Sequence, residues 1–314
     1  MAGPSEQAAG SGLESVREAA FAGRFYPGEA GQAVREAAQY LAAGAAVAAR
    51  ELGSTSRRWI GGIVPHAGWI CSAAIAGATI AQLKAACGEV KPDVVVVFGA
   101  IHTPVPPPPA ALLDGYRRWA IPGSRVDVAV ELRERLGGEP GRKFTEDERF
   151  HRNEHAVEVE LPLIAAAFGR AMVLPVEVPV IEAAVEIGEA TAAVVKSMGL
   201  SAVYLASSDL THYGPSYRFA PAGIGPVGLA WAKENDRRLL DLVSGLAAEQ
   251  IVPHVRQYHN ACGPGAIAAM LAACRSSGAS AGRLLRHASS FETLAEVAPQ
   301  PPVDAVGYAS VVIG

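Results

Sequence analysis

The chain has 314 residues, half of them hydrophobic, with 27 basic and 31 acidic side chains and a formal charge of −4. This balance excludes the basic stripe that a nucleic-acid backbone requires, while the length and apolar content allow one large core-forming domain. Four cysteines without a CxxC pair indicate a reducing compartment rather than a disulfide framework.

The N-terminal residues lack the basic and apolar regions of a signal peptide. We expect residues 1–18 to form a disordered segment ahead of a single domain at 19–314. No apolar run approaches the ~18 residues that a membrane span requires. The sequence therefore predicts a cytoplasmic protein without a membrane partner.

The first part of the domain predicts a helix and then a βαβ unit. Residues 30–43 have a helical pattern that ends near Gly44. The βαβ unit consists of a strand at 59–64, a helix at 72–86 and a strand at 94–98. Continuous Val and Ile runs indicate strands buried on both faces of a parallel sheet. The prolines at 104–109 then predict a stiff surface loop.

Helices and strands continue to alternate after this loop. Helical patterns occur at 126–138, 154–168, 181–199, 227–247 and 264–274, and strand patterns at 171–178, 201–209 and 305–313. The alternation predicts the α/β class, as a single three-layer α/β/α domain with a mainly parallel central sheet. In such sheets ligands bind beyond the carboxyl ends of the strands.

Three histidines follow predicted strands at equivalent positions. His66 and His102 follow the two strands of the βαβ unit, and His212 follows the strand at 201–209 with Asp209 three residues before it. A lone histidine at a strand end is more often a structural residue. Three at one edge of a sheet indicate a metal or acid–base site.

A cysteine opens the predicted helix at 264–274. A thiol at a helix N-terminus has a lowered pKa, so Cys262 is a candidate thiolate that attacks electrophiles or binds soft metals. The alternative for Cys262 is burial as a small hydrophobic side chain. Burial is the expected state of the cysteines in the alanine-rich helical stretches, Cys71, Cys87 and Cys274.

Four further residues are candidates for supporting or substrate-binding roles. Glu154 and His155 begin the helical pattern at 154–168, where an acid can simply cap the helix. A carboxylate beside an imidazole can also orient the groups around a metal. Tyr213 and Trp69 can form the walls of an aromatic pocket.

Six motifs carry a resemblance to a known family: FAGRFYPG, PHAGWICSAAIAG, GAIHTP, NEHAVEVELPLI, SSDLTHYG and YHNACGPGAI. They occur in the order and at roughly the spacing of the Memo family, whose bacterial members are called AmmeMemoRadiSam system protein B. The resemblance extends from about Phe21 to Ile313. It implies the fold of the class III extradiol dioxygenases, whose strand-end histidines hold non-haem Fe(II). It also implies AMMECR-type and radical-SAM proteins as partners.

The resemblance further implies a ligand set for iron or copper. The ligands would be His66 of the PHAG motif, His102 and Cys262 of the CG pair, and Asp209 and His212 would line the same pocket. This chain has GAIH where the family usually has a GPSH-like stretch. The histidine is retained, and the missing serine alters the loop or a hydrogen bond that supports the histidine.

Three functions remain open from the sequence. In the first, Fe(II) or Cu(I) activates dioxygen to oxidise a small or peptidic aromatic substrate, with His212 as general acid and base and Asp209 orienting it. The second is a non-catalytic protein that sequesters metal or holds a peptide on a dioxygenase-like fold. The third is a metal-independent hydrolase with Cys262 as nucleophile and His212 as base.

Overall fold

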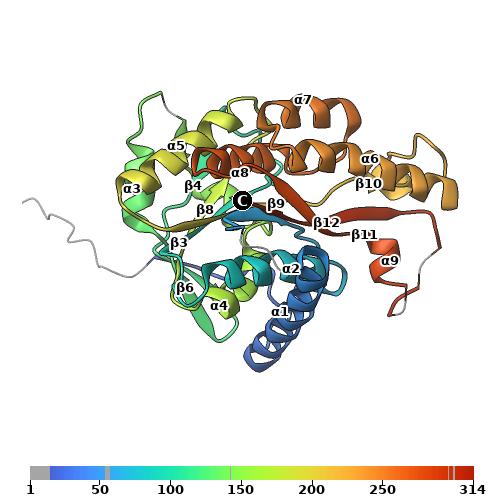
Figure 1. Ribbon diagram of the computed structural model, residues 1–314, viewed down its shortest axis with the longest axis horizontal. Helices are drawn as coiled ribbons and strands as arrows, with labels where there is room; N and C mark the ends of the chain where they lie inside the picture. Colours follow the sequence, from blue (N-terminus) through green and yellow to red (C-terminus); the bar gives the residue numbers. More distant parts are fainter. Residues whose placement is uncertain (1–14, 54–56, 142, 296, 300) are drawn as a thin grey trace, which may run out of the picture.

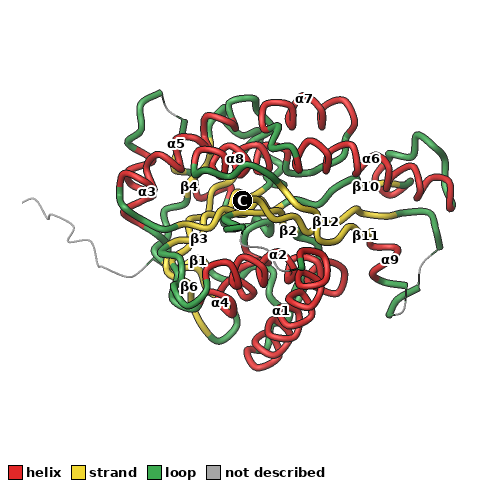
Figure 2. Tube along the Cα trace, viewed as in Figure 1, coloured by secondary structure: helices red, strands yellow, loops and turns green. Residues whose placement is uncertain are grey.

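The structure is a computed structural model that describes residues 15–53, 57–141, 143–295, 297–299 and 301–314. Helices cover both faces of a central sheet (Figures 1 and 2). The predicted α/β class with three layers is thereby confirmed.

The central sheet is mixed rather than mainly parallel. Its strand order is β10 (His212–Tyr213), β12 (Ala305–Ile313), β2 (Gly61–Val64), β9 (Ala202–Ser207), β3 (Val94–Gly99), β8 (Met172–Glu177), β4 (Ala111–Leu113) and β7 (Phe144–Glu146), and β11 (Gly282–Ser289) also pairs with β12. The central strands β2, β9, β3 and β8 are parallel. Strand β12 runs antiparallel to β2, and β4 runs antiparallel to β8. The sequence did not reveal these directions, because a buried strand is a continuous apolar run whichever way it points.

The helices divide between the two faces of the sheet. One face carries α1 (Ala30–Leu52), α2 (Trp69–Cys87) and α4 (Leu161–Phe168) (Figure 1). The other carries α3 (Val130–Gly137), α5 (Ala184–Ser197), α6 (Pro226–Ser244), α7 (Ala248–Tyr258) and α8 (Pro264–Ser276). The four-residue helix α9 (Ser290–Thr293) follows β11. Short 3-10 turns occur at Glu148–Phe150, Glu158–Glu160 and Pro215–Tyr217.

Helix α1 continues beyond Gly44, where the sequence predicted its end. A Cβ atom added at Gly44 would lie 2.4 Å from the backbone of Gly77 in α2. The glycine therefore permits close packing of two helices instead of ending one.

Helix α2 is long and apolar enough to span a membrane, contrary to the expectation that no segment reaches this length. Of its apolar window, 56% is buried inside the fold, where α2 packs against α1 and the sheet. This burial is the pattern of a core helix.

The N-terminal prediction requires a correction. Residues 1–14 of the segment expected to be disordered lie outside the described residues. Val16 and Arg17, however, form strand β1, which pairs with β5 (Arg118–Ile121) and, through it, β6 (Ser124–Asp127) in a small second sheet. The strand is held because the Arg17 guanidinium is buried in an ion pair with Glu158.

The helical pattern at 154–168 is shorter in the structure than predicted. Glu154 and His155 lie in a loop, and α4 begins only at Leu161 after the 3-10 turn at Glu158–Glu160. This loop approaches the carboxyl ends of the parallel strands, where the candidate site lies.

Candidate metal centre

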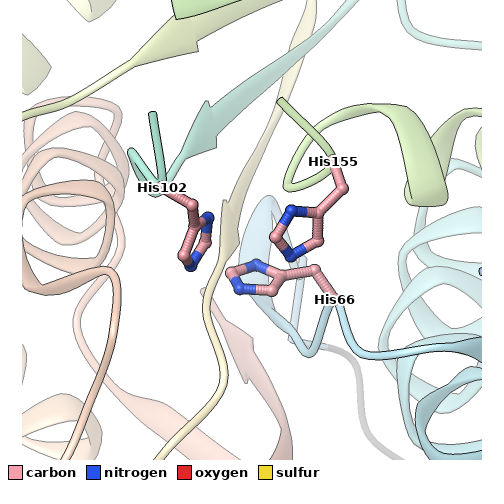
Figure 3. A group of neighbouring side chains, drawn as sticks. All are labelled: His66, His102 and His155. Atoms are coloured by element: carbon pink, nitrogen blue, oxygen red, sulfur yellow. The ribbon is translucent and has the colours of Figure 1, made fainter. Parts of the chain in front are cut away.

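Three imidazole rings meet at the carboxyl edge of the parallel strands (Figure 3). His66 follows β2, His102 follows β3, and His155 comes from the loop that precedes α4. One ring nitrogen from each can be chosen so that the three lie within 4.8 Å of one another. The ring centroids are 5.0 Å apart for His66–His102 and for His66–His155, and 4.5 Å for His102–His155. Such a group can hold a metal ion.

The tautomer of His66 follows from its hydrogen bonds. Its Nδ1 lies 2.9 Å from the Ser207 hydroxyl oxygen, and the Ser207 hydroxyl donates to the Ala156 carbonyl at 2.5 Å. Because the hydroxyl hydrogen is already committed, Nδ1 of His66 must carry its own proton and donate it to Ser207. The Nε2 lone pair of His66 is therefore free to bind a metal.

One buried carboxylate orients the other two rings. Oε1 of Glu154 accepts from Nδ1 of His102 at 2.9 Å and lies 3.2 Å from Nδ1 of His155. Oε2 accepts from the backbone N–H of His102 at 2.6 Å. Burial opposes the charge on Glu154, but the hydrogen bonds from His102 and His155 hold its pKa well below the usual range. Because Glu154 takes up Nδ1 of both rings, their Nε2 atoms are the ones that would bind a metal, after release of any proton that they carry, as in the carboxylate–histidine arrangements that support metal ligands.

The fourth candidate ligand is a thiol. Sγ of Cys262 lies 3.2 Å from Nε2 of His66 and accepts from the backbone N–H of Asp209 at 3.3 Å. Burial lowers the pKa of His102, but hydrogen bonds with Cys262 and Glu154 outweigh burial and raise it to about 10. The structure thus brings His66, His102 and Cys262 together and adds His155.

Asp209 does not occupy the position that the sequence predicted. Its Oδ1 accepts from the backbone N–H of His66 at 2.8 Å, and its carbonyl oxygen accepts from the N–H of Cys262 at 3.2 Å. Burial raises the pKa of Asp209 to about 7. Among the described residues, no hydrogen bond joins Asp209 to His212. Asp209 therefore fastens the turn that carries His66 to the loop that carries Cys262.

His212 lies beside a pocket that adjoins Cys262. The pocket has a volume of about 410 Å³, and its lining includes Val180, Leu210, His212, Val255, Arg256, His259, Ala261, Cys262 and Pro264. Within the described part of the chain, the Nε2 atom of His212 is buried without a hydrogen-bond partner. Burial, followed by the nearby His102 and His155, lowers the pKa of His212 to about 4. The ring is therefore neutral near pH 7, and one of its nitrogens can accept a hydrogen bond.

The two predicted aromatic walls are core residues. Trp69 is 4% exposed, its ring packs near Tyr26 and Tyr40, and its indole N–H donates to the Val159 carbonyl. Tyr213 is fully buried, with its hydroxyl donating to the Gly223 carbonyl. Neither lines the pocket, so the prediction that these rings bind substrate is wrong for this conformation. An aromatic residue beside a motif has the same sequence pattern whether it faces a pocket or the core.

Two features of the site were missed or misplaced from the sequence. His155 was expected to support the ligands, whereas its ring is a member of the imidazole cluster. His151 was not a site candidate, yet it is fully buried beside this loop, with Nε2 3.0 Å from the Leu112 carbonyl. The NEH tripeptide marked this loop as part of a family motif. The local sequence does not indicate the direction in which a loop side chain points.

Comparisons with known proteins match nearly the whole chain. The family described as "Memo-like protein" matches residues 17–312. A MEMO1 family protein of Methanococcoides burtonii is 32% identical over 304 residues, which cover 95% of this chain and 100% of the relative. A MEMO1 family protein of Methanosarcina acetivorans is 30% identical, with 95% and 99% covered. One of Thermococcus onnurineus is 29% identical, again with 95% and 99% covered.

Proposed function

Because this chain belongs to the Memo family, we propose that it is a non-haem metalloprotein with its centre at His66, His102, His155 and Cys262. The observation that carries the proposal is the orientation of the three rings. Each Nδ1 faces an oxygen acceptor, and among the described residues this leaves three Nε2 atoms without a partner other than Cys262. Ordered Nδ1 partners of this kind are typical of metal-binding histidines.

The donor set supports Fe(II) or Cu(I) as the metal. Imidazole binds iron, copper and zinc, whereas a thiolate favours softer ions such as Cu(I). The cluster lacks the carboxylate ligand of the two-histidine, one-carboxylate iron sites, because Glu154 is occupied by His102 and His155. When bound, either redox metal would supply the capacity to activate dioxygen.

We further propose that the reaction is oxidation of a small or peptidic aromatic substrate. The pocket beside Cys262 has mainly apolar walls and a volume of about 410 Å³, which suits one aromatic group. His212 would accept a hydrogen bond from a phenolic or amide donor, because its ring is neutral and its Nε2 has no partner among the described residues. Apolar contacts would orient the substrate and exclude water from the reacting edge.

A second candidate function is non-catalytic metal or peptide binding in the same pocket. One observation favours it: His212 lacks the carboxylate partner that was expected from Asp209, because the Asp209 carboxylate holds the His66 turn. A base without an orienting group is a weaker catalyst.

The experiment that tests the proposal is anaerobic purification followed by metal analysis and oxygen-consumption assays. We expect iron or copper near one equivalent per chain, and oxygen uptake with a reductant and tyrosine-containing peptides. His66→Ala should abolish both the bound metal and the uptake. Bound metal without uptake would favour the non-catalytic function. Absence of iron and copper from the reduced, metal-supplied protein would contradict the oxygenase and the metal-binding function, and only peptide binding would remain.

A further inference from the structure

A buried arginine on β1 binds the loop that carries Glu154 and His155. Arg17 is only 2% exposed, and its Nε donates to the His151 carbonyl at 2.7 Å. Its Nη2 donates to the Glu154 carbonyl at 2.8 Å, and its Nη1 pairs with Oε2 of Glu158 at 2.5 Å. One planar guanidinium thus contacts three points of the loop, which a flexible ammonium could not reproduce.

The partner carboxylate fastens the N-terminal segment to the same loop. Glu158 accepts from the backbone N–H groups of Ala20 and Phe21 at 3.0 and 2.7 Å, and from the Tyr26 hydroxyl at 2.8 Å. We call residues 17–26 together with Glu158 the N-terminal clasp. Each oxygen of the buried Glu158 carboxylate accepts at least two hydrogen bonds. The buried charge is therefore fully hydrogen-bonded in a low-dielectric environment.

The clasp also lies against the imidazole cluster itself. The rings of Phe21 and Phe25 lie 5.5 and 4.8 Å from the ring of His155, centroid to centroid. The Phe25 carbonyl accepts from the backbone N–H of Trp69 at 2.7 Å, three residues after His66. The clasp therefore touches both the His155 loop and the His66 turn.

We propose that Arg17 and Glu158 are a positioning pair for the metal centre, fixing the 151–158 loop so that Glu154 and His155 hold their orientation. Neither residue belongs to the imidazole cluster or lines the pocket beside Cys262. A buried ion pair often contributes little to stability compared with an apolar pair of the same volume, so a precise geometric role is a reason for its presence here. This inference rests on the proposed metal centre.

The test compares Arg17→Met with a matched control, Arg133→Met. Arg133 is also buried and paired with a carboxylate, Asp114, at 3.0 Å, and its hydrogen bonds go to Asp114 and Tyr116 rather than to residues 151–158. We expect Arg17→Met to weaken Co²⁺ affinity about 10- to 100-fold, as for other groups that orient ligands, and to change the visible Co²⁺ spectrum. Arg133→Met should lower the melting temperature while its Co²⁺ affinity stays at the wild-type value.

A milder variant and a metal-free measurement complete the test. Tyr26→Phe removes one hydrogen bond to Glu158 and should give a smaller loss of affinity; it decides the question if Arg17→Met does not fold. The ring N–H signals of His102 and His155, followed by NMR without metal, should shift in the clasp variants and not in Arg133→Met. Unchanged affinity and unchanged ring signals in the folded clasp variants would overturn the inference. A wild-type protein that binds no metal would instead contradict the proposed function, while the ring signals would still decide the positioning role.

Discussion

At the scale of single residues, the acceptor that each Nδ1 atom contacts fixes the orientation of the imidazole ring. Ser207 and Glu154 accept these N–H groups, and both are completely buried. Ser207 is the last residue of β9, and it was not predicted from the sequence to be part of the site. Its hydroxyl nevertheless orients the His66 ring. Removing either acceptor would free a ring to rotate without removing any ligand.

Ser207→Ala tests this control of the ring. The change removes the acceptor for Nδ1 of His66 and leaves the Ala156 carbonyl unpaired, so we expect a loss of about 1–3 kcal/mol of stability. Metal affinity should fall about tenfold or more, measured by anaerobic competition titration. The matched control is Ser310→Ala, which removes a buried hydroxyl 2.8 Å from that of Thr79 in the core. A Ser310→Ala variant that lost as much metal affinity would argue against an orienting role for Ser207.

Cys262→Ser separates the two candidate metals. Thiolate is a soft donor that Cu(I) prefers strongly, whereas Fe(II) accepts oxygen donors, so Cu(I) affinity should fall far more than Fe(II) affinity. Competitive titration of both ions under anaerobic conditions measures the difference. Cys274→Ser is the control, because that thiol is buried in α8 beside Met270 and should leave both affinities unchanged. Wild-type Cu(I) affinity in Cys262→Ser would remove Cys262 from the ligand set.

At the scale of elements, loops that follow different strands are joined to one another. Thr211, in the loop before His212, accepts from Asn235 of α6 through its hydroxyl and donates its N–H to Asp236. Asn235 also donates to the Tyr258 carbonyl, and Asn260 donates to the Asn235 carbonyl. Helix α6 therefore sets the spacing between the loop that precedes His212 and the loop that carries Cys262. On the opposite face, α1 and α2 meet through close contact between small residues.

Gly44→Ala tests the contact between α1 and α2. The added Cβ would lie 2.4 Å from the Gly77 backbone, which cannot move aside without separating the helices. We expect a loss of about 1–3 kcal/mol in the free energy of unfolding, measured in urea. Gly137→Ala, at the end of α3, has nothing within 4 Å of the added atom and should be neutral or slightly stabilising. Equal effects of the two substitutions would contradict the packing role of Gly44.

At the scale of the whole molecule, the helices on both faces of the central sheet bury several titratable groups that lie near the site. His151 is fully buried between the Leu112 carbonyl and Glu177, whose Oε1 is 3.9 Å from its Nδ1. Burial lowers the pKa of His151 to about 3. An unfolded chain would bind a proton at this residue near pH 6.5, whereas the folded chain would not. The stability of the fold is thereby linked to pH.

His151→Asn should make the protein less sensitive to acid. In the wild type, the folded pKa lies below the unfolded pKa, so this contribution is present above pH 6.5 and is lost as the pH falls toward 3. Between about pH 7 and pH 5 the loss from this one residue is about 2 kcal/mol. Urea unfolding of the metal-free wild type and variant at both values measures it, because effects of other residues cancel in the comparison. Equal losses in both proteins would mean that His151 is protonated in the folded state.

The sequence by itself determined the alternation of strands and helices, the strand-end histidines and the cysteine before α8. These features are local: a buried strand needs a continuous apolar run, and the residues that follow it reach the sheet edge whatever the rest of the chain does. For this reason the order of residues alone indicates His66, His102 and His212 as strand-end candidates and Cys262 as a candidate thiolate, although His212 does not join the imidazole cluster. The directions of the strands at the sheet margins cannot be identified in this way, because the apolar content of a strand does not encode its direction.

Only the tertiary structure decided the partners and the orientation of side chains. Arg17 meets Glu158 across 141 residues, and Asp209 meets the His66 backbone across 143. Trp69 and Tyr213 turned toward the core, and His155 toward the cluster, although the sequence around each contains no sign of direction. The physical reason is that a side chain's direction depends on packing between segments that are far apart in the sequence, and a motif specifies only the order of residues within its own segment.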